Sequence, residues 1–166
     1  MVFLGFSYDK VRAMKTLRIS LQLFSFIFII LITSGCEPEH SNRLYQKISP
    51  YSFDDTLENL DLAISEHNYR IIHRSHIGQA IRDRGDTDFP LSTIINFCNI
   101  TYAKEMLQID QQLINDMPCF IAVSEQEGST IVSTKLMAIV PNNKAQISFA
   151  GKINQNLIDI INAAIE

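Results

Sequence analysis

Two cysteines, Cys98 and Cys119, are the residues of this chain best suited to do chemistry. A thiol can serve as a redox group or as a metal ligand, but these two do not have the CxxC spacing of common redox and zinc motifs. Three interpretations therefore stay open: two small buried core residues, a structural disulfide formed in an oxidising compartment, or a redox, metal or cofactor site. Asn99 can cap a helix that begins directly after Cys98, and the dipole of that helix favours a thiolate. Cys98 is therefore the predicted attacking sulfur of any thiol chemistry, with Cys119 as its resolving partner or a bystander.

The histidines indicate little further chemistry. His73 and His76 are three residues apart in a predicted strand, so they point to opposite faces and cannot chelate one metal as a pair. His67 lies on the apolar face of a predicted helix, as core histidines do, and His40 lies in a polar linker. The sequence contains no nucleophile elbow, phosphate-binding loop, HExxH motif or paired-carboxylate pattern. It therefore predicts no metal site and no catalytic centre, and it indicates no particular cofactor.

The N-terminal segment has the pattern of an export signal. An apolar run over residues 21–32 follows the basic residues Lys15 and Arg18. The run is shorter than the roughly 20 residues that a membrane span needs, but it matches the length of a signal-peptide core. Residues 1–35 are therefore predicted to be a signal peptide, with Met14 as an alternative start.

The end of this leader resembles a bacterial lipobox. Small residues, Ser34 and Gly35, precede Cys36, although Thr33 stands where leucine is usual. The resemblance implies cleavage before Cys36, which then carries palmitate-type acyl chains and anchors the protein to a membrane. Glu37 in place of aspartate implies the outer membrane, facing the periplasm, in a Gram-negative host. An uncleaved signal anchor and an ordinary secretory leader are the alternatives.

Composition predicts one acidic domain after a short linker over residues 36–42. The chain has 166 residues, 46% of them hydrophobic, which suffices for a core without disulfides. Of its 14 basic and 18 acidic residues, four basic and one acidic belong to the leader, so residues 36–166 carry 10 and 17, a net charge of −7. Such a charge argues against nucleic acid as a partner. The domain is assigned to residues 43–166.

The helices of this domain are predicted from apolar spacing and caps. Ser52 begins a helix over residues 53–67, with Asp55 completing a capping box and Asn68 closing the helix in a left-handed turn. A short helix over residues 77–84 stops at Gly85. Another helix follows Asn99, and a final amphipathic helix covers residues 153–164.

The strands are predicted from alternation and β-branched residues. They cover residues 43–48, 69–76 and 91–98, followed by a hairpin of residues 118–125 and 129–140 around Glu127 and Gly128. In the second strand, Tyr69, Ile71 and His73 are predicted to share one face. A hairpin between flanking helices favours an α+β fold, with helices packed on one face of a largely antiparallel sheet.

Four segments resemble the family known as domain of unknown function 302, or DUF302. They are the helix start Tyr51–Leu57, the strand start Asn68–Ile72, the Phe97-Cys98-Asn99 step into a helix with Tyr102-Ala103, and the Met117-Pro118-Cys119 step into a strand. The resemblance implies a sheet of four to five strands similar to the TATA-box-binding-protein-like fold, dimers in some members, and no established activity. The chain departs from the family at Ile100, where proline is common. A fold shared with DNA-binding proteins does not imply DNA binding.

Two function classes remain for the domain. The first and favoured one is a non-catalytic module that binds a small ligand or a protein segment in a groove between helices and sheet. The second is a thiol-based redox or metal-binding protein that uses Cys98 and Cys119. A homodimer is a possible assembly in either case.

Overall fold

A computed structural model describes residues 43–166 of the chain. The predicted signal peptide, the lipidation site Cys36 and the linker lie outside the described residues. In chain order the elements are β1 (Leu44–Ser49), α2 (Phe53–Glu66), β2 (Arg70–His76), α3 (Ile77–Arg82), β3 (Ser92–Cys98), α4 (Ile100–Ile109), the 3₁₀ helix η2 (Gln111–Asp116), β4 (Cys119–Gln126), β5 (Ser129–Lys135) and α5 (Lys144–Ile165). No helix within residues 43–166 is long and apolar enough to cross a membrane.

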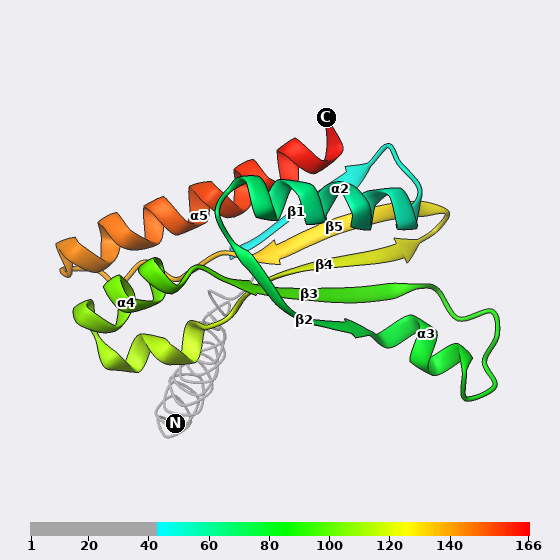
Figure 1. Cartoon of the computed structure of the whole chain (residues 1–166), viewed down its shortest axis with the longest axis horizontal. Coiled ribbons are helices and arrows are strands. Elements are labelled where there is room, and N and C mark those ends of the chain that lie inside the picture. The colour runs from blue at the N-terminus through cyan, green and yellow to red at the C-terminus, as the bar shows by residue number, and fades with distance from the viewer. Residues whose placement is uncertain (1–42) are drawn as a thin grey trace, which may run out of the picture. The chain divides into compact units, whose positions relative to one another are not determined.

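The five strands form one antiparallel sheet in the order β1-β5-β4-β3-β2. Helices α2 and α5 lie side by side along this sheet (Figure 1). The predicted α+β class, with an antiparallel sheet and packed helices, is confirmed. The β4–β5 hairpin turns at Glu127 and Gly128, whose φ angles of 49° and 80° are those that a two-residue hairpin turn requires.

The core lies between the two long helices and the sheet. It is formed by apolar side chains that are almost completely buried, among them Leu60, Ile64, Ile95, Phe97, Ile121, Val123, Val132, Ile160 and Ile161. The predicted N-terminal helix is confirmed together with its caps: the Ser52 hydroxyl oxygen accepts a hydrogen bond from the Asp55 N–H at 3.2 Å, and Asn68 has a φ of 61°.

Strand β2 contains a bulge that the sequence did not predict. Ile71 pairs with Phe97 on β3, but the next paired residue, His73, lies opposite Asn96, so Ile72 is an extra residue. The prediction that Ile71 and His73 share one face is therefore wrong, because the extra residue shifts the alternation by one position.

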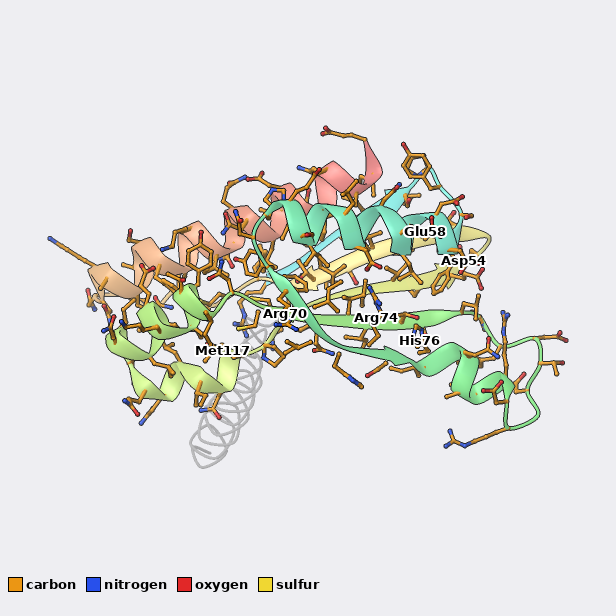
Figure 2. All side chains as sticks on the ribbon, in the orientation of Figure 1. Asp54, Glu58, Arg70, Arg74, His76 and Met117 are labelled. Carbon is orange, nitrogen blue, oxygen red and sulfur yellow. The ribbon has the colours of Figure 1, made fainter. Side chains whose placement is uncertain are left out.

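The bulge changes which side chains in the second half of β2 lie on the helix-covered face of the sheet. Arg74 extends toward α2 and forms an ion pair with Asp61 (Figure 2). His76 lies with its Nδ1 atom 3.1 Å from the hydroxyl of the buried Thr93. Without the extra residue, Arg74 would point to the opposite face of the sheet, so one inserted residue determines which polar groups meet α2.

Two elements at the C-terminal end differ from the predicted bounds. Strand β5 ends at Lys135 rather than at residue 140, because Leu44, the first residue of β1, pairs with Lys135 and no partner strand extends further. Side chains of α5 bind the backbone beyond it: the Asn154 amide accepts from and donates to Met137 at 2.7 and 3.0 Å. Helix α5 begins at Lys144 rather than at residue 153, where Asn143 caps it by accepting from the Gln146 N–H.

Candidate ligand-binding site

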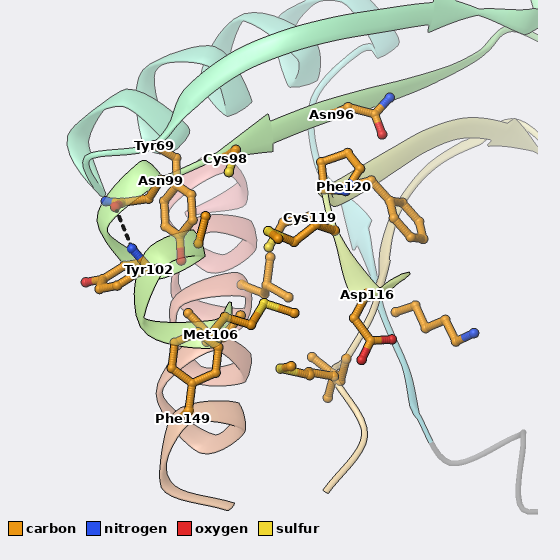
Figure 3. A pocket seen from close by; sticks show the side chains of 18 of the residues that line it. Tyr69, Asn96, Cys98, Asn99, Tyr102, Met106, Asp116, Cys119, Phe120 and Phe149 are labelled. Atoms are coloured by element: carbon orange, nitrogen blue, oxygen red, sulfur yellow. Dashed lines mark hydrogen bonds between the residues drawn. The ribbon is translucent and has the colours of Figure 1, made fainter. Parts of the chain in front are cut away.

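A cavity of about 340 Å³ lies at one end of the sheet. Helix α4 and η2 form one side of it, and the end of β3, the start of β4, the segment after β5 and helix α5 form the rest (Figure 3). Most of its lining is apolar, with Phe149, Ile153 and Leu157 contributed by α5. Arg43, Asp116 and Lys135 are its charged lining residues. The volume lies in the range of small-molecule sites.

Asn99 positions the helix that covers this cavity. Its side-chain oxygen accepts hydrogen bonds from the backbone N–H groups of Thr101 and Tyr102 at 2.9 and 3.1 Å, as predicted for the cap of α4. Its amide nitrogen donates to the Asn68 carbonyl at 2.9 Å. One side chain therefore joins the start of α4 to the segment that enters β2.

Lys152 holds α4 against α5. Its ammonium group lies 2.6 Å from a carboxylate oxygen of Glu105 on α4. The same nitrogen lies 4.7 Å from the ring centroid of Tyr102 and 5.1 Å from that of Phe149, within the range of cation–π interaction. The two helices that enclose the cavity are thus connected by polar as well as apolar contacts.

Tyr69 is a buried tyrosine that lines this cavity. Tyr69 is 6% exposed. Its ring and that of Phe97 are nearly perpendicular, with ring centroids 5.3 Å apart. The Asn156 amide donates to the Tyr69 oxygen at 3.1 Å. Because the nitrogen of the Asn156 amide faces Tyr69, its oxygen does not accept the Tyr69 proton. No other acceptor for this proton is found within residues 43–166. Burial is the main cause that raises the pKa of Tyr69 to about 12, so the phenol is a neutral donor at physiological pH.

The structure brings both predicted thiols to this cavity, and neither forms a disulfide. Their strands are adjacent, but Phe97 rather than Cys98 pairs with Cys119. Paired residues of an antiparallel sheet share a face and successive residues alternate, so the two cysteines leave the sheet on opposite faces. A disulfide needs converging Cβ atoms, so this pair could not form one without a shift of the backbone.

Burial raises the pKa of both thiols. For Cys119 the pKa rises to about 11, mainly by desolvation and further by the neighbouring Cys98. The pKa of Cys98 is raised as well, again by desolvation. Desolvation thus shifts the pKa of Cys98 upward, opposite to the direction expected from the adjacent start of α4. The role of either thiol in redox chemistry stays a prediction.

Several lining residues were not singled out as site residues from the sequence. Tyr69 was assigned only to a strand face and Met106 only to the inner stripe of a helix, while Met117 and Met137 carried no signal of a site. All four line this cavity, and Figure 3 shows Tyr69 and Met106 there. They come from separate segments of the chain, so no local spacing could have grouped them.

The histidines do not gather at the cavity. His73 lies opposite Asn96 and His76 opposite Thr93, which confirms the prediction that they lie on opposite faces of the sheet. His67 has its Nδ1 atom 2.8 Å from the Ala63 carbonyl, so its own helix satisfies it. Within residues 43–166, no group of three His, Cys, Asp or Glu side chains is arranged to hold a metal ion.

Comparison with known proteins places this architecture in a family. The profile of the family described as "Domain of unknown function DUF302" matches residues 45–164, which include every element from β1 to α5 except their outermost residues. The chain belongs to the DUF302 family. The resemblance read from the Cys98-Asn99 and Pro118-Cys119 steps is therefore confirmed.

A solved structure supports the DUF302 fold. The crystal structure of an uncharacterized conserved DUF302 protein from Bacillus stearothermophilus superposes with a TM-score of 0.66. The match covers 75% of this chain and 99% of that chain at 16% sequence identity. At this identity the similarity concerns the fold alone. A search of curated proteins found no match. The DUF302 assignment thus establishes the architecture, while the function has to be argued from the cavity.

Proposed function

We propose that this DUF302 domain is a non-catalytic binding module whose cavity takes up a small, neutral, largely apolar ligand. The observation that carries the proposal is the cavity itself: about 340 Å³, lined mainly by apolar side chains, with the buried Tyr69 among its lining residues. Ligand sites in proteins typically combine such apolar walls with a few polar groups that fix orientation.

The polar groups of the cavity favour a ligand that accepts a hydrogen bond. The Tyr69 phenol and the thiols of Cys98 and Cys119 have raised pKa values, so all three are neutral donors near pH 7. Groups that stay protonated at neutral pH are suited to orienting a carbonyl or ether oxygen. They are less suited to general-base or nucleophilic catalysis, which needs the deprotonated form.

Nile red, a neutral dye with a carbonyl acceptor, provides a direct test. Ala103 lines the cavity and is 9% exposed, so Ala103→Leu should fill part of the space and abolish dye binding. Ala163→Leu makes the same change on the exposed side of α5 and should leave binding unchanged. Binding that is absent in the wild type, or equal in the two variants, would contradict the proposal.

The hydroxyl group has its own test. Tyr69→Phe removes the donor but keeps the ring. It should weaken the affinity for the dye by roughly 3- to 10-fold, which corresponds to the net contribution of one hydrogen bond. Tyr51→Phe is the matched control, because Tyr51 is 39% exposed and does not line the cavity. An unchanged affinity in Tyr69→Phe would remove Tyr69 from the site while leaving the cavity proposal to the Ala103 test.

We also propose that the domain is held at the bacterial cell envelope by acyl chains on Cys36, facing the periplasm from the outer membrane in a Gram-negative host. The support is the leader pattern, and two or more acyl chains give stable anchoring. Mass spectrometry of the membrane fraction should find acylated Cys36, and Cys36→Ser should release the protein. A variant that stays membrane-bound to the same extent would indicate an uncleaved anchor.

A further inference from the structure

Every sulfur-containing residue within residues 43–166 lines the same cavity. The two thiols are Cys98 and Cys119, and the three thioethers are Met106, Met117 and Met137. They come from the end of β3, from α4, from the segment that enters β4 and from the segment after β5. Three methionines in a core could fill gaps at unrelated places, but here all of them line the cavity that both cysteines also line.

The donor atoms at this cavity are soft. Thiolate and thioether sulfur suit Cu(I), zinc and iron–sulfur clusters, whereas carboxylate, carbonyl and water oxygens suit magnesium, calcium and manganese. No group of three His, Cys, Asp or Glu side chains is gathered anywhere in residues 43–166, so the usual ligand sets for zinc are not formed there. Within residues 43–166, this cavity is the place where all the sulfur-containing residues are found together.

Charge balance also favours a monovalent ion. One thiolate and one Cu(I) ion together are neutral, and thioether ligands add no charge. A divalent ion bound to the same ligands would leave a net positive charge in an apolar cavity, which is costly. Met106 and Met137 are 5% and 9% exposed, so these thioethers already lie in surroundings from which water is largely excluded.

We infer that the cavity binds one Cu(I) ion through the Cys119 sulfur and the thioether sulfurs of Met106, Met117 and Met137. On binding, the Cys119 S–H bond breaks, its proton passes to solvent and a sulfur–copper bond forms, while copper stays in the +1 state. The three thioethers donate lone pairs without losing a proton. Methionine side chains have three rotatable bonds, which allows the sulfurs to close on the ion.

This inference uses the same cavity as the proposed function but rests on different atoms. The apolar ligand requires free space and the Tyr69 hydroxyl, whereas copper requires the sulfur atoms. Replacing all three methionines by leucine keeps the cavity apolar and nearly conserves side-chain volume. The triple variant Met106→Leu, Met117→Leu, Met137→Leu should therefore lose copper and retain Nile red, while Tyr69→Phe should retain copper.

The test is an anaerobic titration of the full-length chain in detergent with Cu(I), in competition with the chelator bicinchoninate. The wild type should withdraw one equivalent of Cu(I) from the chelator, and X-ray absorption should show a coordination shell of sulfur. The triple leucine variant should bind at least 100-fold more weakly, and Cys119→Ser should not bind. Cys36→Ser should bind as the wild type does, which excludes the third cysteine as a ligand.

Two results would overturn the inference. One is a wild-type protein that leaves all Cu(I) with the chelator. The other is a triple leucine variant, shown to be folded by circular dichroism, that binds with unchanged affinity. If Cys119→Ser fails to fold, the volume-conserving triple variant still decides the question. The copper inference can thus fail while Nile red binding succeeds, and the reverse, so the two proposals are separable.

Discussion

The Cys119 thiol should react much more slowly with an alkylating reagent than an ordinary cysteine does. Desolvation, with a smaller effect of Cys98, raises its pKa from 9.0 to about 11. Only the thiolate attacks the reagent. Two pKa units reduce the thiolate fraction at pH 8 by roughly 100-fold, and the rate of alkylation should fall by the same factor. Cys98, whose pKa is raised by desolvation alone, should react before Cys119.

Iodoacetamide labelling between pH 7 and pH 11, read from peptide masses, measures both rates separately. The same protein unfolded in urea is the control, because it returns both thiols to water. The groups that line the cavity with Cys119 and could alter its titration are Tyr69, Cys98, Asp116, Lys135 and Arg43. The Cys98→Ser variant removes the effect of Cys98 on the pKa of Cys119. The midpoint of the pH dependence of Cys119 labelling should therefore move slightly toward lower pH.

One result would refute this reasoning. If Cys119 in the folded protein is alkylated at pH 8 as fast as in urea, its sulfur is hydrated and the cavity is not the apolar space described above. Equally slow labelling of both thiols, relieved only by unfolding, would instead exclude Cys98 as an attacking sulfur. It would leave both as buried residues whose only open role is metal binding.

The remaining predictions concern stability and assembly. Leu60→Ala should lower the free energy of unfolding by about 3 kcal/mol in urea titrations, because the side chain is fully buried, whereas Leu62→Ala, 61% exposed on the same helix, should change it by less than about 0.5 kcal/mol. Equal losses of unfolding free energy in the two variants would mean that the wrong face of α2 has been assigned to the core. The Leu60→Asp variant should not fold at all, because it places an unpaired charge in the core. Asn99→Ala should cost about 1 kcal/mol by removing the cap of α4, and thermal unfolding by circular dichroism should register it. The raised pKa of Cys119 means that the folded state holds this proton more tightly than the unfolded state. Stability should therefore be fully present below about pH 9 and fall by about 2 kcal/mol as the pH rises toward 11, and a Cys119→Ser variant should lack that loss in urea titrations at pH 8 and pH 10.5. The homodimer expected from the family resemblance should appear as twice the monomer mass in light scattering after size exclusion, and a single-chain mass would contradict it.

Local sequence predicted the elements whose causes are local. Ser52 and Asp55 define the start of α2 through backbone–side-chain contacts within one turn, and Glu127 with Gly128 defines the hairpin through backbone angles that few residues adopt. Alternation placed Ile95 and Phe97 on one face of β3, and both are buried. Each of these features depends on residues close together in the chain, so their types and spacing suffice.

Features that depend on a partner element could not be predicted in this way. The sequence of β2 does not show that Ile72 is an extra residue, because a bulge is defined only by the register with β3. Strand β5 ends at Lys135 because β1, its antiparallel partner, begins opposite that residue, although the apolar pattern continues to Val140. The backbone beyond it is bound by Gln146 and Asn154, which a strand prediction cannot anticipate.

The sequence by itself determined the family, the fold class and the two thiols as the residues most suited to chemistry. Only the tertiary structure decided that Tyr69, Met106 and Met137 join Cys98 and Cys119 at one cavity. It also decided that the two thiols leave the sheet on opposite faces. The physical reason is that a cavity is formed by the packing of distant segments, and a one-residue difference in strand register exchanges the faces of a sheet without changing any local pattern.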